Sequence, residues 1–284
     1  MTLDPLRLSR GRPRDPQRGL RYRSGQAATE AVLLFAALLL AASASGQTDK
    51  RRSGYQDMGP ALQEMQDDDT ANPAMLFVAE GRTLWSQKAG EAGKACADCH
   101  GEASMQGVAA RYPAMSQPAD KGGDARPVDL EGRINLCRTG RQKAEPLAPE
   151  SRELLALSAY VALQSRGRPI APPDDPRLVP LRARGQEIWR QRQGQLNLAC
   201  ASCHDDNAGK KLAGATIPQG HPTGYPIYRL EWQTLGSLKR RLRNCLIGLR
   251  AAAWPYDAAE YLDLEFYLMA RARGMKMDAP AVRP

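Results

Sequence analysis

Apolar residues recur at helical spacing in four segments of the chain, two in each half. No segment shows the sustained alternation of apolar and polar residues that marks a half-buried strand. The segments are EGRTLWSQ at 80–87, LLALSAYVALQSRGRP at 154–169, RGQEIWRQ at 184–191 and YLDLEFYLMARARGMK at 261–276. The pattern predicts an all-α protein in which the last helix of each half packs on the first. Its core is predicted to include Trp85, Tyr160, Trp189 and Tyr267.

The longest apolar run, AVLLFAALLLAA at 31–42, lies close to the N-terminus. Seven arginines precede it, and the small residues Ala42-Ser43-Ala44 follow it as a cleavage site of the A-x-A type. This order predicts a signal peptide over residues 1–44 and a periplasmic mature protein without a membrane segment. The alternative is an uncleaved membrane anchor, but the apolar run is shorter than the ~20 residues of a comfortable span.

The two halves of the chain repeat one unit. Gly81 precedes Cys96 by 15 residues, and Gly185 precedes Cys200 by the same 15. Each half then contains a Tyr-Pro pair, one further cysteine and a closing apolar helix. Between the halves lies GRPIAPPDDPRLVP, whose prolines are typical of a linker that few contacts cross. We therefore predict two tandem domains at 60–168 and 181–280, joined by a linker at 169–180.

Four of the six cysteines belong to two Cys-x-x-Cys-His runs, Cys96-Ala-Asp-Cys99-His100 and Cys200-Ala-Ser-Cys203-His204. This pattern is the attachment signal of c-type haem, in which both thiols bond to the haem and the histidine ligates its iron. The alternatives are a redox dithiol and half of a zinc site. A redox pair has no need of the histidine that both copies keep. The sequence therefore predicts two covalently attached haem c groups in two cytochrome c-like domains.

The remaining cysteines, Cys137 and Cys245, are the candidates for the second axial ligand of each iron, because they occupy equivalent positions of the repeat. We predict that their thiolates lie opposite His100 and His204. His221 is the only spare histidine, and we expect no role for it. Methionine is the usual alternative ligand, but the candidates do not lie at equivalent positions: Met105, Met115 and Met269. A Cys137–Cys245 disulfide and the inert burial of both residues also remain open.

Basic residues are denser around Cys245 than around Cys137. Arg241 precedes Cys245 by one helical turn and therefore shares its face, as Arg133 does with Cys137. A guanidinium at this place can bind an oxyanion and lower the pKa of the thiol. We assign the other basic residues of this segment to a solvated helix face: Lys239, Arg240 and Arg243.

Composition and charge exclude some classes of protein. The chain is 42% hydrophobic and 25% charged, as in ordinary globular proteins, whereas aromatic residues make up only 6%. The 25 glycines and 21 prolines suit short helices joined by long loops around a group that is not protein. The net charge of +9 comes partly from the N-terminal arginines, and no long basic run contains interleaved aromatic residues. Nucleic acid is therefore not an expected partner.

Several of these features together resemble the SoxA family, the dihaem subunits of the SoxAX sulfur-oxidation cytochrome complexes. They are the tandem attachment runs, an Arg-x-x-x-Cys in each half, the ending CLIGLRAA…EYLDLEFYL and the export signal. The resemblance covers roughly residues 60–280. It implies pairing with a small monohaem cytochrome, SoxX, in an L-cysteine S-thiosulfotransferase. That enzyme joins thiosulfate oxidatively to a cysteine of the carrier protein SoxYZ, and two electrons leave through haem.

The resemblance also implies roles for individual residues. The C-terminal haem becomes the active site, with His204 and Cys245 as its ligands and Arg241 as the anion-binding residue. Cys245 is then a residue that can be modified to a persulfide. His100 and Cys137 ligate the N-terminal haem. In one mechanism the Cys245 sulfur accepts the thiosulfate sulfur and passes it to the carrier thiol; in the other it only tunes the haem.

Two other functions are compatible with these residues. A thiosulfate dehydrogenase couples two thiosulfates to tetrathionate without a protein acceptor, and typically has only one cysteine-ligated haem. A dihaem electron carrier has no enzymatic role and predicts methionine or histidine as the distal ligands. Low-spin His/thiolate signals at both irons in an EPR spectrum would exclude the electron carrier.

Overall fold

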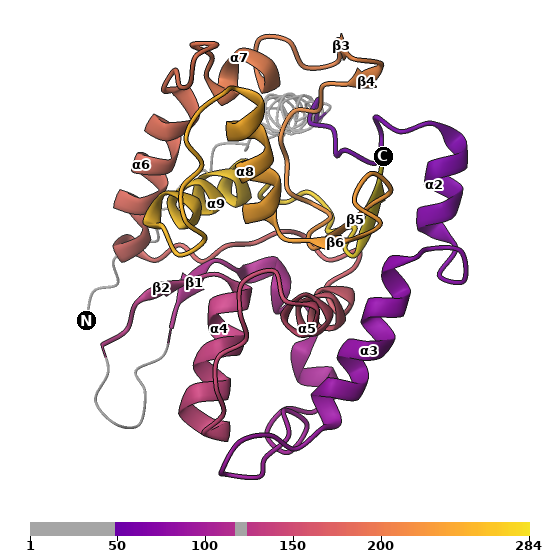
Figure 1. The fold of residues 1–284 in the computed structure, drawn as a ribbon, viewed down its shortest axis with the longest axis vertical. Helices are drawn as coiled ribbons and strands as arrows, with labels where there is room; N and C mark the ends of the chain where they lie inside the picture. The colour runs from indigo at the N-terminus through magenta and orange to yellow at the C-terminus, as the bar shows by residue number, and fades with distance from the viewer. Residues whose placement is uncertain (1–48, 117–123) are drawn as a thin grey trace, which may run out of the picture. The chain divides into compact units, whose positions relative to one another are not determined.

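In each half of the chain, two helices cross at close range. The computed structural model describes residues 49–116 and 124–284. In the first half α3 (Ala74–Ser86) crosses α5 (Arg152–Leu163), and in the second α6 (Val179–Arg190) crosses α9 (Ala259–Arg271) (Figure 1). A Cβ atom on Gly81 would lie 2.1 Å from the carbonyl oxygen of Ala156, and one on Gly185 would lie 2.0 Å from that of Asp263. Only glycine permits so close an approach, and this explains its repetition in the sequence.

A shorter helix in each half carries the lone cysteine. Helix α4 (Leu130–Cys137) begins after Asp129, whose side chain accepts a hydrogen bond from the backbone N–H of Gly132 at 2.6 Å. Helix α8 (Leu238–Gly248) begins after Ser237, whose hydroxyl accepts one from the backbone N–H of Arg240 at 3.1 Å. These caps satisfy otherwise unpaired N–H groups and fix where each helix starts.

The remaining helical segments are short. The second attachment run itself forms α7 (Cys200–His204), and α2 (Pro60–Asp67) precedes the first half. Single turns connect the longer elements: η1 (Glu102–Met105), η2 (Ala109–Arg111), η3 (Arg138–Gln142) and η4 (Pro176–Leu178).

Three small sheets complete the described part of the chain. Two are antiparallel pairs, β1 (Ala114–Met115) with β2 (Pro127–Val128) and β3 (Lys211–Leu212) with β4 (Ala215–Thr216). The third has the order β6-β5-β7 and joins β5 (Ile227–Arg229), β6 (Thr234–Gly236) and β7 (Ala281–Arg283). Here β5 is antiparallel to β6 and parallel to β7, with Tyr228 opposite Leu235 and Val282. Strands of two or three residues are too short to show alternation, so the sequence did not indicate them.

The mostly helical architecture predicted from the sequence is confirmed, and the last helix of each half does pack on the first. Four aromatic residues predicted to lie in the core are at most 8% exposed: Trp85, Tyr160, Trp189 and Tyr267. The predicted signal peptide, 1–44, falls outside the described residues. Among the residues that are described, no helix has the length and apolar character needed to cross a membrane.

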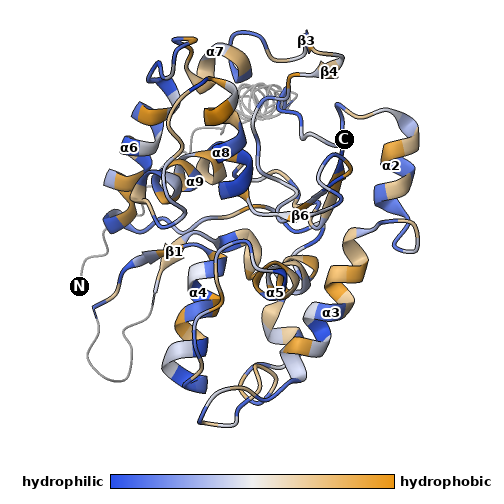
Figure 2. Ribbon diagram, viewed as in Figure 1, coloured by the Kyte–Doolittle hydropathy of each residue, from blue (hydrophilic) through white to orange (hydrophobic). Residues whose placement is uncertain are grey.

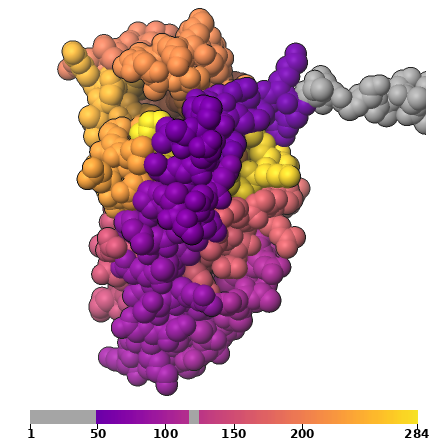
Figure 3. All heavy atoms as spheres, turned by 90° about the vertical axis from the view of Figure 1, so that its right-hand side faces the viewer, coloured from indigo at the N-terminus to yellow at the C-terminus, as the bar shows by residue number. Residues whose placement is uncertain are grey.

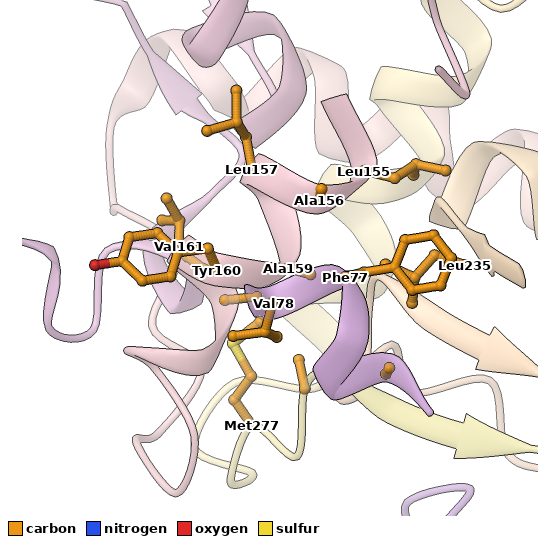
Figure 4. Close-up of a cluster of buried hydrophobic side chains, with 14 of the residues drawn as sticks. Phe77, Val78, Leu155, Ala156, Leu157, Ala159, Tyr160, Val161, Leu235 and Met277 are labelled. Carbon is orange, nitrogen blue, oxygen red and sulfur yellow. The ribbon is translucent and has the colours of Figure 1, made fainter. Parts of the chain in front are cut away.

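The two halves share one apolar core. Phe77 and Tyr160 of the first half pack in the same cluster as Leu235 and Met277 of the second (Figure 4). The ring of Phe77 also lies 6.2 Å from that of Tyr228 on β5. The second half has a further cluster of its own, centred on Trp189. The halves therefore repeat in sequence, but residues of the second half complete the core of the first.

The proline-rich segment between the halves is held by this core. Ile170 is fully buried, and its backbone N–H donates a hydrogen bond to the carbonyl oxygen of Met275 at 2.9 Å. The N–H of Gly167 bonds to the carbonyl oxygen of Met277 at 2.7 Å. The expectation that few contacts cross this segment is therefore wrong, because a buried isoleucine and backbone pairing anchor it. The domain limits at 60–168 and 181–280 stay predictions.

Candidate functional site

The first attachment run borders a cavity of about 540 Å³. Cys96, Cys99 and His100 line it, and α4 brings Cys137 to the same space. Cofactor sites commonly have volumes of ~300–1,000 Å³, so the size is suitable for a large flat group. The fold thus brings together the residues predicted to attach and ligate the first haem. Axial ligation by His100 and Cys137 stays a prediction.

Trp85 supplies an unpaired hydrogen-bond donor to the first cavity. Its Nε1 is buried and has no hydrogen-bond partner in the described part of the chain. Its ring lies 6.0 Å from that of His100 and 5.5 Å from that of Tyr160. Because buried donors are almost always paired, this position suits a group that brings an acceptor, such as a haem carboxylate. The residues of the first cavity fit haem c.

The second attachment run borders a smaller cavity, of about 360 Å³. His204 lines it from α7, and Arg241 and Cys245 line it from α8. The Nδ1 atom of His204 lies 2.7 Å from the carbonyl oxygen of Pro218. A proton on Nδ1 makes this a hydrogen bond and leaves Nε2 available as an iron ligand. Cys200 packs against the apolar cluster of this half. These residues also fit haem c.

The surroundings of the Cys245 thiol make it easier to ionise than an ordinary cysteine. Burial alone would raise its pKa, but hydrogen bonding to His204 and the positive charges of Arg241 and Arg229 outweigh burial and lower the pKa. By contrast, burial and the proximity of Cys245 raise the pKa of the Cys200 thiol to about 11. Thiolate is the form that binds metals and attacks sulfur, so the pocket prepares Cys245 for either role.

Two guanidinium groups face each other in the second cavity. Arg229, at the end of β5, and Arg241 both line it. Burial and the charge of Arg241 lower the pKa of Arg229. The guanidinium of Arg229 is partly neutralised by the carboxylate of Glu231, which lies 2.8 Å from it. The Arg241 side chain forms no hydrogen bond or ion pair with any residue of the described ranges, 49–116 and 124–284. A small anion would relieve this repulsion, so the cavity is built to receive one.

The sequence did not single out Arg229 because it stands on a three-residue strand without a recognisable motif. The same holds for Arg283, on β7, which also lines the second cavity. Arg283 is already paired, at 3.1 Å, with Asp278. Only the three-stranded sheet brings these two side chains to α8. A local pattern could not have indicated them.

The first described residues of the chain also border the second cavity. Gly54, Met58 and Leu62 are among its lining residues. The backbone N–H of Arg52 donates to the Gln219 side chain at 2.7 Å, which fastens this segment to the loop after α7. Figure 3 shows the beginning of the described chain lying across the surface beside the C-terminal residues. We call residues 51–62 the N-terminal strap. The first cavity is bordered instead by the proline-rich segment before α6, through Pro173, Asp175 and Arg177.

The start of α8 is strongly hydrophilic (Figure 2). It is nevertheless not a solvated face, because Lys239, Arg240 and Arg243 are half-buried, so that expectation is wrong. Lys239 forms an ion pair of 2.5 Å with Asp129, and its side chain is only 18% exposed. Arg240 stacks on Trp232, with its guanidinium carbon 4.4 Å from the ring centre. Arg243 donates to the carbonyl oxygen of Trp254. Tertiary partners contributed by distant segments hold each of these side chains, and helical periodicity cannot reveal such partners.

A polar chain supports the tryptophan of the second half. The Nε1 of Trp189 donates to Asp205 at 2.7 Å, and the guanidinium of Arg271 donates to the other carboxylate oxygen at 2.7 Å. Arg271 also lies 4.9 Å above the indole ring. Asp205 directly follows His204, whereas Gly101 follows His100. This one difference in the repeat explains why Trp189 has a hydrogen-bond partner among the described residues and Trp85 has none.

The structure bears on the alternative roles of Cys137 and Cys245, namely a disulfide between them or methionine as the iron ligand. None of the six cysteines, all within the described residues, forms a disulfide, and Cys137 and Cys245 line different cavities. Met105 and Met115 line the first cavity beside Cys137, whereas Met269 does not line the second. His221 lies at the edge of the second cavity, where its Nδ1 is 3.0 Å from the carbonyl oxygen of Arg52.

Comparison with known proteins agrees with this arrangement. The family described as "SoxA/TsdA, cytochrome c domain" matches residues 80–170 and 184–277, one segment in each half. The L-cysteine S-thiosulfotransferase subunit SoxA of Pseudaminobacter salicylatoxidans is 36% identical over 83% of this chain and 82% of its own length. The chain belongs to the SoxA family. The corresponding subunit of Rhodovulum sulfidophilum is 35% identical over 83% of this chain and 81% of its own length.

A solved structure extends this family relationship to the fold. The crystal structure of SoxXA from P. pantotrophus matches with a TM-score of 0.76 and 31% identity, over 82% of this chain and 87% of that one. The matched cytochrome c domains imply haem c as the cofactor of this chain. The SoxA relatives and the shared fold thus confirm the family that the sequence resembles.

Proposed function

We propose that the chain is the dihaem subunit of a periplasmic L-cysteine S-thiosulfotransferase and that its second cavity is the active site. In this proposal haem c is attached at Cys96 and Cys99 in the first half and at Cys200 and Cys203 in the second. The observation that carries it is the placement of Cys245, Arg241 and His204 around one cationic cavity. An electron carrier has no need of an anion site beside an ionised sulfur.

Each residue of the cavity has a defined task. Arg241, without a protein partner among the described residues, binds the sulfonate oxygens of thiosulfate, and Arg229 adds positive charge from the opposite wall. Pro218 orients the imidazole of His204 through Nδ1. Cys245 presents its sulfur from the same helical face as Arg241. Haem c, when bound at this site, accepts the electrons one at a time.

The proposed reaction is balanced in atoms and electrons. Thiosulfate and the Cys245 thiolate form an S–S bond and release two electrons, which leave Cys245 carrying an S-thiosulfonate group. The thiolate of a SoxYZ-like carrier protein then attacks the sulfane sulfur, the first S–S bond breaks, and the Cys245 thiolate is restored. A thiol on the carrier releases its proton to solvent. The positive charges of Arg241 and Arg229 favour the thiolate of Cys245, which is the nucleophile in the first step and the leaving group in the second.

Partners and compartment complete the proposal. The match to a SoxXA complex supports a SoxX-like monohaem cytochrome as the stable partner that receives the electrons. The basic, apolar and small-residue order of positions 1–44 supports export to the periplasm. There the SoxYZ-like carrier brings the acceptor cysteine to the second cavity.

The test compares the two equivalent cysteines. Cys245→Met is expected to reduce conjugation of thiosulfate to the carrier thiol by about 1,000-fold or more, because the nucleophile is lost. Cys137→Met, the matched control, is expected to retain most activity. Mass spectrometry of the carrier protein measures the product, and a haem count with EPR spectra verifies both irons. Undiminished turnover by Cys245→Met would exclude the covalent route, and tetrathionate formation without the carrier would favour a dehydrogenase.

A further inference from the structure

A third, small cavity of about 60 Å³ lies between the two larger ones. Tyr112 and Leu130 line both this space and the first cavity. Tyr225 and Leu238 line both this space and the second cavity. Single side chains therefore separate it from the site on either side. We call it the junction cavity.

Equivalent positions of the repeat meet at the junction cavity. Helices α4 and α8 both begin here, and the second residue after the cap is Glu131 in one and Lys239 in the other. Ser158 and Glu265, each two residues before the tyrosine that packs on a crossing glycine, are a second equivalent pair. Equivalent positions of the repeat thus carry chemically different side chains at this cavity. One glutamate comes from each half: Glu131 and Glu265.

The single cation of the junction cavity is already engaged. Lys239 pairs with Asp129, the cap of α4, at 2.5 Å, and both side chains are mostly buried. A lysine in the first turn of a helix is unfavourable with respect to the helix dipole, and Asp129 compensates for it. Glu131 and Glu265 form neither a hydrogen bond nor an ion pair with the described residues, although they line the same cavity. The positive charge nearest to these two carboxyl groups is therefore that of Lys239, which is already paired with Asp129.

The groups that face Glu131 and Glu265 favour bound protons. Burial, with the negative charge of Asp129, raises the pKa of Glu131 to about 8 against the opposing charge of Lys239. The same influences raise the pKa of Glu265 well above its usual value. The hydroxyl of Ser158, which lines the cavity, has no hydrogen-bond partner among the described residues. The other titratable groups near the cavity are Glu150, Tyr112 and Tyr225.

We propose that Glu131 and Glu265 form a proton-binding site shared by both halves, whose occupancy is coupled to the oxidation state of the haem groups on either side. An electron delivered to either cavity adds one negative charge, and one proton taken from solvent onto a carboxylate balances it. Removal of the electron releases that proton. At an effective dielectric constant of about 20, a unit charge roughly 10 Å away changes a proton affinity on the order of tenfold. The inference rests on haem binding in both cavities, as proposed above.

Spectroelectrochemical titration of the haem-loaded protein from about pH 6 to about pH 10 tests this coupling. In the wild-type protein the reduction equilibrium of at least one haem is expected to slope with pH and to change by about tenfold in all, ~59 mV for a one-electron couple, because the coupling itself is about tenfold. Glu131→Gln and Glu265→Gln are expected to reduce this slope by about half or more, because the amide cannot take up a proton. Glu187→Gln, an exposed glutamate on α6, is the matched control and should keep the wild-type slope.

The outcomes separate this inference from the proposed function. A haem count on the same samples verifies that both cavities are loaded, independently of any proton. A wild-type slope that persists in both glutamine variants would assign the proton to another group and overturn the inference. Potentials that do not change with pH would overturn it as well.

A second measurement remains available if a variant does not fold. Redox-difference infrared spectroscopy of the wild-type protein should show a protonated carboxylic acid C=O band that grows on reduction, and its absence would contradict the inference. Unfolding provides a further check. Because the pKa of Glu131 is raised in the folded state, its contribution to stability is present at low pH and is lost as the pH rises through about 8. Glu131→Gln should remove that loss.

Discussion

The first and second cavities are built from the same repeat, yet different elements supply their basic residues. Five arginines line the first cavity and three line the second, so the two cavities differ in where these arginines come from and not in whether they are cationic. The first has a volume of about 540 Å³ and the second about 360 Å³. The second gathers arginines from α8 and the three-stranded sheet, and the N-terminal strap borders it. In the first, Arg133 on α4 stands at the position equivalent to Arg241, and the indole Nε1 of Trp85 is unpaired among the described residues.

This comparison teaches that the repeat supplies the haem site, while residues that are not repeated supply the anion site. The attachment cysteines, the histidine, the distal cysteine and the helix crossing recur in both halves. Arg283 and the strap belong to elements outside the repeated unit, whereas Arg229 ends β5, which follows the repeated Tyr-Pro pair; all three line the cavity of Cys245. A site that binds haem thus becomes a site that also binds a small anion.

The feature that the halves share most closely is the helix crossing, and its disruption has the largest expected effect. Gly81→Ala and Gly185→Ala each force a Cβ atom onto a carbonyl oxygen, at 2.1 and 2.0 Å. Each should lower the free energy of unfolding by about 3 kcal/mol or more. Denaturant unfolding followed by circular dichroism measures this. Gly248→Ala, where an added Cβ meets nothing within 4 Å, is the control. A small loss in either crossing variant would show that the helices can separate.

The arginine before each lone cysteine tests the difference between the two cavities. Arg241→Ala should lower kcat/KM for thiosulfate by roughly 10- to 100-fold, since a charge-assisted hydrogen bond to an anion is lost. Arg133→Ala, the equivalent change in the first half, should alter it by less than about twofold. Initial rates over a range of thiosulfate concentrations measure both. Equal losses from the two variants would place the anion site elsewhere.

The tryptophans give the smallest expected difference. Trp189→Phe removes the hydrogen bond to Asp205 and leaves a partly buried carboxylate with one donor fewer, so stability should fall by about 1 kcal/mol beyond any loss of packing. Trp85→Phe removes a donor without a protein partner in the described chain. In the haem-loaded protein its loss should approach that of Trp189→Phe if a haem carboxylate accepts this bond. Thermal unfolding with and without reductant compares them, and a negligible effect of Trp85→Phe would exclude that acceptor.

The sequence predicted the parts of the fold that depend on local patterns. Helical spacing indicated the long helices, and the duplicated glycine and cysteine positions indicated the repeat. The first attachment run and Cys137 line the first cavity, and His204 and Cys245 line the second; the runs were recognisable because covalent attachment fixes their spacing. Ion pairs and stacking across the fold were not predictable, and so Lys239 was placed wrongly on a solvated face. The burial of Ile170 was missed for the same reason, since its partners lie about a hundred residues further along the chain.

The shared apolar core determines how the chain can be divided. Leu235 and Met277 belong to the same apolar cluster as Phe77. A fragment cut at the proline-rich segment would therefore expose the apolar surface around Phe77 to water. We therefore expect that the first half does not fold stably without the second. A relative that gave up its first attachment run would still have to retain α3 and α5 as scaffolding for the remaining active site. The number of haem groups and the integrity of the fold are thus under separate constraints.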